Sequence, residues 1–207
     1  MLSKEYLDEF VRKTAAKEPV PGGGGVSALA GALGVALANM AANYTKGKKD
    51  FAKFDVIYDE MIEKNAELYE RMLKLIDDDA EGFLPLLSAF AIKAETEEEK
   101  EAKKAAMQDG YKNAIKAPLA MLDCCFEACL MLEELADHTV SSMLSDIAVS
   151  AQMLRAALNG TYANVLVNVK EIEDKEYVGL VFENMDRIMQ NGLTICDTVF
   201  WDALNNL

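Results

Sequence analysis

The sequence predicts an all-α fold, a multihelical bundle of long antiparallel helices that forms a single domain over residues 1–207. Apolar residues recur at helical spacings of three and four along most of the chain. No turn typical of a β-hairpin separates alternating apolar and polar segments. With 207 residues, of which 51% are hydrophobic, the chain can bury a sizeable core, and no linker-like stretch divides it.

Glycine and alanine dominate the first part of the chain. An apolar stripe beginning at Leu7 and Phe10 predicts a helix within residues 4–17. Gly22 to Gly25 then precede a helix predicted over Ser27–Tyr44, with Ser27 as its N-cap. Because alanine and glycine make up most of this helix, we expect it to be buried and closely approached by its neighbours.

Prolines and capping residues delimit the middle helices. A long apolar row runs from Ile62 to Phe83, and Pro85 is expected to end or kink that helix. Thr96 and Glu99 form a capping-box pattern at the start of a helix that is predicted to run to Ala117. Pro118 is then expected to bend the chain into a helix over residues 119–135.

The last helices have weaker boundary signals. Ser141 or Ser142 is expected to cap a helix that ends before Gly160, a residue placed like a C-terminal glycine. Residues 164–169 form a short apolar run that fits either a helix or a strand. Asp174 is expected to cap the final helix, which runs to about Trp201.

Charge and composition exclude several classes of protein. A net charge of −14 disfavours binding to nucleic acid or to anionic membranes, since both need clustered cations. Residues 26–42 are short for a membrane span and rich in alanine, so we expect no membrane association. Acidic residues within residues 1–10 argue against a signal peptide, and a cytoplasmic location is expected. The four cysteines lack nearby histidines and acids, so we expect buried thiols and no metal site; they are Cys124, Cys125, Cys129 and Cys196.

The glycine run allows two interpretations. It lacks the Gly-Lys-Ser/Thr ending of a P-loop, and no strand precedes it as a dinucleotide-binding motif requires. One interpretation is a nest in which backbone N–H groups bind an oxygen anion or a carbonyl. The other is a flexible hinge between two helices.

Six motifs together resemble one known family. They are residues 21–33 (Pro-Gly-Gly-Gly-Gly-Val-Ser-Ala-Leu-Ala-Gly-Ala-Leu), 45–49 (Thr-Lys-Gly-Lys-Lys), 79–83 (Asp-Ala-Glu-Gly-Phe), 117–118 (Ala-Pro), 145–146 (Ser-Asp) and 164–168 (Asn-Val-Leu-Val-Asn). Their order and spacing are similar to those of the formiminotransferase-cyclodeaminase C-terminal domain and of free-standing methenyltetrahydrofolate cyclohydrolases. The resemblance implies an all-helical fold that forms a homodimer and a folate substrate, a one-carbon-substituted tetrahydrofolate. It also implies that no metal or separate cofactor takes part.

Asp79 is the candidate for the catalytic acid–base group. It follows Leu68, Met72 and Leu75 on one helical row, so a carboxylate stands where the pattern asks for an apolar residue. Burial would raise its pKa toward neutrality, which suits a group that both takes and gives a proton. The alternative is that residues 77–79 form an exposed acidic helix end. The resemblance favours the catalytic role.

Other candidate residues follow from the same motifs. The resemblance implies that Lys48 stabilises charge on a reacting oxygen or that Lys49 holds folate carboxylates; alternatively, the lysines are a solvated helix end. Asn164 and Asn168 share a helical face, so their amides could form hydrogen bonds with the donor and acceptor groups along the edge of a pterin. Asp146 either binds substrate or, as a carboxylate near the start of a helix, interacts favourably with the helix dipole. The full set expected to bind substrate is Pro21, Gly22, Gly23, Gly24, Ser27, Thr45, Lys49, Asp146, Asn164 and Asn168. His138 receives no role.

Three functions remain open on the sequence. The resemblance implies either hydrolysis of methenyltetrahydrofolate to formyltetrahydrofolate or cyclodeamination of formiminotetrahydrofolate with release of ammonia. The lack of a fused formiminotransferase domain favours the cyclohydrolase. A non-catalytic helical scaffold or binding module is the third possibility, and it predicts an exposed Asp79 and no affinity for folates.

Overall fold

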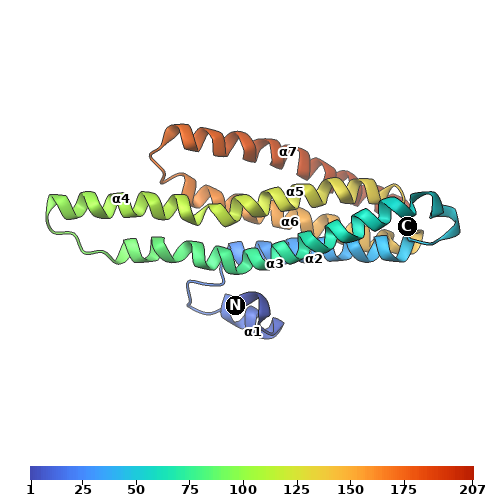
Figure 1. The fold of residues 1–207 in the computed structure, drawn as a ribbon, viewed down its shortest axis with the longest axis horizontal. Coiled ribbons are helices and arrows are strands. Elements are labelled where there is room, and N and C mark those ends of the chain that lie inside the picture. The colour runs from blue at the N-terminus through green and yellow to red at the C-terminus, as the bar shows by residue number, and fades with distance from the viewer.

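Seven α-helices form the protein in the computed structural model, which describes residues 1–207 (Figure 1). They are α1 (Leu7–Thr14), α2 (Gly23–Thr45), α3 (Asp55–Ala91), α4 (Glu97–Ala114), α5 (Lys116–Ala136), α6 (Leu144–Val169) and α7 (Lys175–Asn205). Short 3-10 turns occupy Leu2–Lys4, Lys49–Phe54 and Ser141–Met143, and no strand is present. The predicted all-α bundle is therefore confirmed, and residues 164–169 are helical.

Helix α2 packs closely between α3 and α6, as its small residues predict. A Cβ added to Gly34 would lie 3.0 Å from Leu154 Cγ and 3.2 Å from the Ser150 carbonyl oxygen, both in α6. The Ser150 hydroxyl donates a 2.7 Å hydrogen bond to the Gly34 carbonyl across this contact. On the other side, a Cβ on Gly31 would overlap the Met72 side chain of α3. Only small residues allow the backbones to approach this closely.

The start of α2 differs from the prediction. The helix begins at Gly23, and Gly22 is its N-cap residue in an extended conformation. Ser27 lies one turn inside the helix, where its hydroxyl donates a 2.7 Å hydrogen bond to the Gly23 carbonyl. The prediction of Ser27 as N-cap was wrong because Ser27 faces Gly160, whose added Cβ would overlap the hydroxyl. The glycines belong to the first helical turn, and the hinge interpretation does not describe them.

The helix boundaries near the two prolines differ from those predicted. Pro85 lies inside α3, which continues to Ala91 instead of ending there. Next to it, Leu86 packs against α4 so tightly that a Cβ on Gly110 would lie 3.0 Å from its Cα. The break between α4 and α5 falls at Ile115, three residues before Pro118. Pro118 sits in the first turn of α5, where an N–H needs no helical acceptor, and α5 continues the line of α4 (Figure 1).

Capping predictions were right at two helices and wrong at a third. Thr96 and Glu99 form a complete capping box, and Asp174 accepts a hydrogen bond from the Tyr177 N–H. The serines at 141 and 142 instead lie in a 3-10 turn and cap no helix through their side chains. Gly160 is an interior residue of α6, where it makes room for Ser27.

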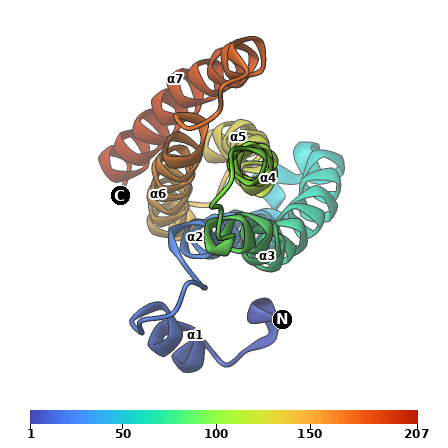
Figure 2. The ribbon, with the colours of Figure 1, turned by 90° about the vertical axis from the view of Figure 1, so that its left-hand side faces the viewer.

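The first 3-10 turn and α1 together form an N-terminal unit, residues 1–14, that lies beneath the bundle (Figures 1 and 2). Helix α1 is shorter than the helix predicted within residues 4–17. The Leu2 N–H and the Ser3 hydroxyl both donate hydrogen bonds to the buried Asp77 carboxylate of α3, which holds the first turn in place. In α1, Phe10 is buried, whereas Leu7 is 67% exposed although it belongs to the predicted apolar stripe. The outer side of α1 therefore has no partner within the chain.

Replacing Gly34 by Ala should lower the free energy of unfolding by about 1–3 kcal/mol, because backbone atoms of α6 leave no room for the added methyl group. Chemical denaturation followed by circular dichroism measures this change. The matched control is Gly179→Ala in α7, where nothing lies within 4 Å of the added Cβ. That control should gain up to about 1 kcal/mol from helix propensity. Equal effects of the two substitutions would contradict the packing of α2 on α6.

Candidate active site

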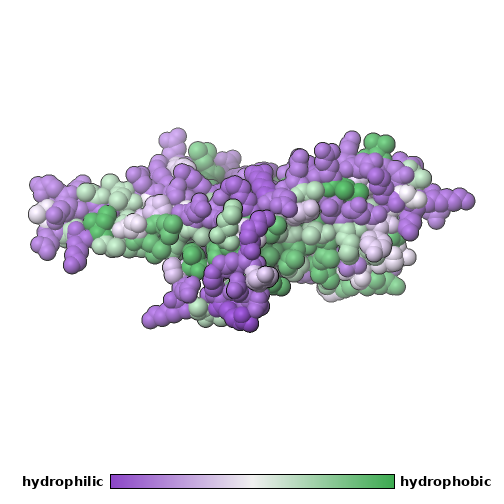
Figure 3. Space-filling view, turned by 60° about the horizontal axis from the view of Figure 1, so that its bottom comes forward, coloured by the Kyte–Doolittle hydropathy of each residue, from purple (hydrophilic) through white to green (hydrophobic).

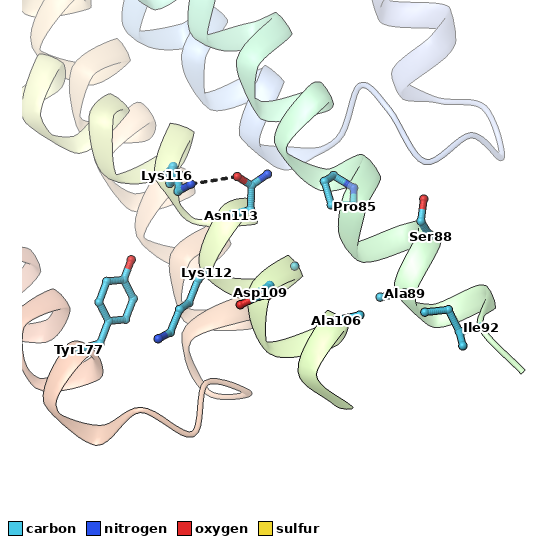
Figure 4. A pocket seen from close by; sticks show the side chains of 11 residues that line it. Pro85, Ser88, Ala89, Ile92, Ala106, Asp109, Lys112, Asn113, Lys116 and Tyr177 are labelled. Atoms are coloured by element: carbon cyan, nitrogen blue, oxygen red, sulfur yellow. Dashed lines mark hydrogen bonds between the residues drawn. The ribbon is translucent and has the colours of Figure 1, made fainter. Parts of the chain in front are cut away.

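A small cavity of about 170 Å³ lies at the N-terminal end of α2. Helices α3, α4, α5 and α6 complete its walls. The lining residues are Pro19, Val20, Gly22, Gly23, Gly24, Asp79, Phe83, Ala114, Pro118, Asn164, Val167 and Asn168. A larger cavity of about 890 Å³ between α3, α4 and the start of α7 contains none of the predicted site residues (Figure 4). Residues from four of the six sequence motifs therefore line the smaller cavity.

Asp79 lies directly against the first turn of α2. A Cβ added to Gly24 would fall 2.5 Å from the Asp79 carboxyl carbon and closer still to both oxygens. Leu68, Met72 and Leu75 are buried on the same row of α3, as predicted. Asp79 itself is half-buried, so the interpretation of residues 77–79 as an exposed acidic helix end does not hold.

Two opposing effects act on the Asp79 carboxyl group. Burial disfavours its charged form and raises its pKa from 3.8 to about 6, whereas a hydrogen bond from the Gly25 backbone amide lowers the pKa. Burial has the larger effect. A carboxyl group with a pKa near 6 exists in both protonation states close to neutral pH, which suits general acid–base chemistry.

Asn164 and Asn168 lie on α6 and line the cavity, as their spacing predicts. The Asn164 amide donates a 2.7 Å hydrogen bond to the Gly160 carbonyl, and the Asn168 amide donates one of 3.0 Å to the Asn164 carbonyl. A Cβ on Gly23 would lie 3.1 Å from the Asn164 amide nitrogen. The second and third glycines of the run therefore leave space for two polar side chains, those of Asn164 and Asp79.

Several lining residues were not predicted as site residues. Phe83 follows Asp79 by one helical turn, and Val167 lies between the two asparagines. Helical spacing from the predicted residues could have found both. Ala114 and Pro118 lie on either side of the break between α4 and α5; Pro118 belongs to the Ala-Pro motif, whereas only the tertiary structure reveals the place of Ala114.

Four predicted residues lie at the opposite end of the bundle. Thr45 ends α2, and Lys48 and Lys49 follow it; a rise of 1.5 Å per residue puts them roughly 33 Å from the cavity. Asp146 is in the first turn of α6, about 27 Å along that helix from Asn164. Within one chain these side chains do not reach Asp79. Pro21 and Ser27 are buried close to the glycines, although neither lines the cavity.

The remaining histidine and cysteines have structural surroundings. His138 stacks on Phe54 with ring centroids 4.0 Å apart, at the end of the bundle near Thr45. All four cysteines are buried free thiols, as predicted, and the sulfur atoms of Cys129 and Cys196 lie 3.4 Å apart. Burial raises the pKa of the Cys125 thiol, which keeps it protonated. No group of three or more histidine, cysteine or acidic side chains is arranged to hold a metal ion.

Comparison with known proteins identifies the family. The profile of the formiminotransferase-cyclodeaminase family matches residues 6–187, so the chain belongs to this family. The methenyltetrahydrofolate cyclohydrolase of Methylorubrum extorquens is 33% identical over 177 residues, which cover 86% of this chain and 85% of that protein. The formimidoyltransferase-cyclodeaminase of Rattus norvegicus is 32% identical over 188 residues, 91% of this chain but only 35% of the rat protein.

A solved structure shares the complete fold. The crystal structure of formiminotetrahydrofolate cyclodeaminase from Thermotoga maritima superimposes with a TM-score of 0.82 at 26% sequence identity. The match covers 100% of this chain and 98% of that one. The fold and the family therefore agree.

Replacing Asp79 by Asn should stabilise the protein at neutral pH but not at pH 4. The folded-state pKa of about 6 lies above the ordinary 3.8, so the contribution of Asp79 to stability is complete below pH 3.8 and is lost as the pH rises through 6. The uncharged asparagine side chain escapes that loss, which gives a gain of about 1–3 kcal/mol at pH 8. Urea unfolding at both pH values measures the gain.

Asp78→Asn is the matched control for this experiment. Asp78 neighbours Asp79 in sequence but pairs with Lys74 on the surface of α3. Its replacement should change the free energy of unfolding by less than about 1 kcal/mol. A gain from Asp79→Asn that is as large at pH 4 as at pH 8 would be inconsistent with a buried, titrating carboxyl group.

Substituting Gly24 by Ala should displace the Asp79 carboxylate, because the added methyl group would occupy its position. We expect kcat/KM for the family reaction to fall at least about tenfold, since small displacements of a catalytic group have large effects. Gly25→Ala is the control, because its Cβ would lie 3.5 Å from Pro21 and 3.6 Å from Ile76, at ordinary contact distances. Similar kinetics for both variants would contradict the placement of Asp79.

Proposed function

We propose that the protein hydrolyses methenyltetrahydrofolate to formyltetrahydrofolate, with Asp79 as the general acid–base group. The observation that carries this proposal is the half-buried Asp79 carboxyl group, whose pKa is raised to about 6 beside the first turn of α2. The Methylorubrum extorquens relative, which matches over most of both chains, bears the name of this cyclohydrolase.

The reaction requires two proton transfers through the same group, one from the attacking water and one to the departing nitrogen. Water adds to the cationic carbon that bridges two nitrogens of the folate, and the Asp79 carboxylate takes one proton from that water. The carboxylic acid so formed gives the proton to the departing nitrogen as the carbon–nitrogen bond breaks. The hydroxyl proton of the intermediate leaves to solvent as the formyl carbonyl forms. One carboxyl group of suitable pKa serves as base and then as acid.

Backbone N–H groups and side-chain amides around the cavity are suited to stabilise the reacting oxygen and to bind the pterin. The first N–H groups of α2, at Gly23 and Gly24, have no acceptor within the helix. They are suited to stabilise a developing negative charge on the oxygen that adds to the folate. The side-chain carbonyls of Asn164 and Asn168 are available to a pterin, because their amide groups are engaged by the helix backbone.

Cyclodeamination of formiminotetrahydrofolate is the second candidate. The Thermotoga maritima structure that shares the whole fold bears that name. The same carboxyl group would protonate the leaving ammonia while the neighbouring folate nitrogen closes the ring. A non-catalytic scaffold is less well supported, because it predicts an exposed Asp79 and the side chain is half-buried in a cavity.

We also propose an oligomeric state, a cellular location and a set of partners for the protein. The enzyme would act as a homodimer in the cytoplasm, without a metal or separate cofactor and without binding nucleic acid or membrane. Support for the homodimer comes from an apolar face of α2 that nothing in the chain covers. Support for the rest is the net charge of −14 and a chemistry that needs only proton transfer.

Asp79→Asn should lower the rate of methenyltetrahydrofolate hydrolysis by about 10²–10⁴-fold, because the amide cannot exchange a proton. The decay of methenyltetrahydrofolate absorbance measures the rate, and Asp78→Asn, outside the cavity, should retain wild-type activity. A parallel assay of ammonia released from formiminotetrahydrofolate separates the two candidate reactions. Near wild-type rates for Asp79→Asn with both substrates would sink the assignment of Asp79.

A further inference from the structure

One wall of the Asp79 cavity is not helical. Pro19 and Val20 line the cavity together with residues of α2 to α6, and both lie between α1 and α2. We call residues 15–21 the connecting segment. No backbone hydrogen bond involves residues 17–21 of this segment. The position of the wall is therefore set by what holds the connecting segment at its two ends, which are the start of α2 and the N-terminal unit.

Helix α1 has a single buried contact with the bundle. Among residues 7–19, only Phe10 is buried. Its ring lies beside the first turn of α2, where a Cβ added to Gly25 would be 3.9 Å from Phe10 Cζ. The same Cβ would be 3.6 Å from Ile76 of α3, so Phe10 packs where α2 and α3 meet. The N-terminal unit thus contacts the turn whose Gly25 amide donates a hydrogen bond to Asp79.

A buried carboxylate provides the second attachment of the N-terminal unit. Asp77 of α3 is 8% exposed, and the proposed reaction makes no use of it. One of its oxygens accepts a hydrogen bond from the Leu2 N–H, and the other accepts one from the Ser3 hydroxyl. A buried carboxylate is costly without such donors, so these bonds hold the first turn firmly on α3.

Asp77 and Asp79 point to different sides of α3. They are two residues apart, which corresponds to a rotation of about 200° around a helix axis. Asp79 faces the cavity, whereas Asp77 faces the N-terminal unit beneath the bundle (Figure 2). No charged residue other than Asp79 lines the cavity. A path of contacts from Asp77 to the non-helical wall runs through the N-terminal unit and the connecting segment.

Little else holds the N-terminal unit in place. It protrudes from the bundle as a largely hydrophilic mass beside hydrophobic surface (Figure 3). The ion pair between Glu5 and Lys13 lies within the unit itself. The other carboxylate oxygen of Glu5, Oε2, is buried without a hydrogen-bond partner, which disfavours the docked position. Phe10 and Asp77 therefore carry most of the attachment.

From these contacts we infer that Asp77 is a positioning residue of the site: it holds the N-terminal unit on α3 and thereby keeps the connecting segment in place as the wall that shields Asp79 from solvent. The inference rests on the proposed function only for the chemical role of Asp79. Burial is what raises the pKa of Asp79 to about 6, so water that enters past a displaced wall lowers that pKa toward 3.8. A weaker base then takes the proton from water less readily.

Titration of Asp79 in two variants tests the inference without any assay of activity. In Asp77→Ala and in Phe10→Ala, carbon-13 NMR should give an Asp79 midpoint about one pH unit below that of the unaltered protein. Loss of a nearby negative charge also lowers a carboxyl pKa, so Asp78→Asn is the matched control. Asp78 pairs with Lys74 on the surface, and its replacement should shift the midpoint by less than about 0.3 units.

Two patterns in these titrations would overturn the inference. An Asp79 midpoint that stays at about 6 in both Asp77→Ala and Phe10→Ala would show that the N-terminal unit does not shield the carboxyl group. Equal shifts in Asp77→Ala and Asp78→Asn, with none in Phe10→Ala, would assign the effect to charge alone. If Asp77→Ala does not fold, Ser3→Ala removes one of the two donors and should give a smaller shift in the same direction.

Limited proteolysis shows whether the N-terminal unit is released. Trypsin cleaves after Arg12 and Lys13 of α1 only when this part of the chain leaves its helical conformation. Asp77→Ala should be cleaved there at least about tenfold faster than the unaltered protein, as measured by mass spectrometry. Unchanged cleavage would show that Asp77 does not hold the unit. Faster cleavage with an unchanged Asp79 midpoint would show that the unit is not the shielding wall, and either result contradicts the inference.

The pH profile of the proposed reaction separates positioning from a merely structural role. In Asp77→Ala, the acidic limb of kcat/KM for methenyltetrahydrofolate should move to lower pH by the same amount as the NMR midpoint. The rate above this limb should fall about threefold or more, because the base is weaker. A lower rate with the limb still at about pH 6 would indicate only a loss of folded protein and would contradict the inference. An inactive wild-type protein would reject the proposed reaction, whereas the titration and proteolysis would still decide the role of Asp77.

Discussion

The Asp79 carboxylate packs against the first turn of α2 so closely that the neighbouring residue cannot carry a Cβ. A methyl group on Gly24 would lie 2.5 Å from its carboxyl carbon, and one on Gly23 would lie 3.1 Å from the Asn164 amide. These contacts hold α3 and α6 on either side of the glycine end of α2. The same arrangement continues along the helix at Gly31 and Gly34, so one run of small residues sets both the packing of the bundle and the shape of the site.

This packing also explains the electrostatics of the site. A carboxylate at a helix N-terminus is normally stabilised by the helix dipole and by free N–H groups, which lower its pKa. Here burial outweighs the Gly25 amide, and the pKa is raised to about 6. A carboxyl group with a pKa of about 6 can gain or lose its proton near neutral pH at little cost in free energy. That property is what a reaction with two successive proton transfers requires.

Much of the fold followed from local patterns in the sequence, and the errors share one cause. Helical periodicity, the capping box at Thr96 and the cap at Asp174 are local signals, and the structure contains all three. Ser27 and Gly160 were assigned to helix ends because their types are common there, but they face each other across two helices. A contact between residues 133 positions apart has no local signature, so the sequence could not reveal it.

Part of the candidate site could also be predicted from the sequence. Asp79 stood out as a carboxylate on an apolar row, and the glycine run and Asn164 pointed to the same cavity. Lys48, Lys49 and Asp146 belong to the predicted site residues, but they lie at the other end of the bundle from the Asp79 cavity. The 23-residue helix α2 separates the two ends, and the order of motifs along the sequence does not show how far apart they lie in space.

Direct titration of the Asp79 carboxyl group tests the central claim most sharply. Carbon-13 NMR of the side-chain carboxyl groups, with the Asp79 signal assigned by its absence from Asp79→Asn, measures the pKa in the folded protein. The structure predicts a midpoint of about 6. A midpoint near 4, the ordinary range of an exposed aspartate, would contradict a buried acid–base group at the glycine end of α2.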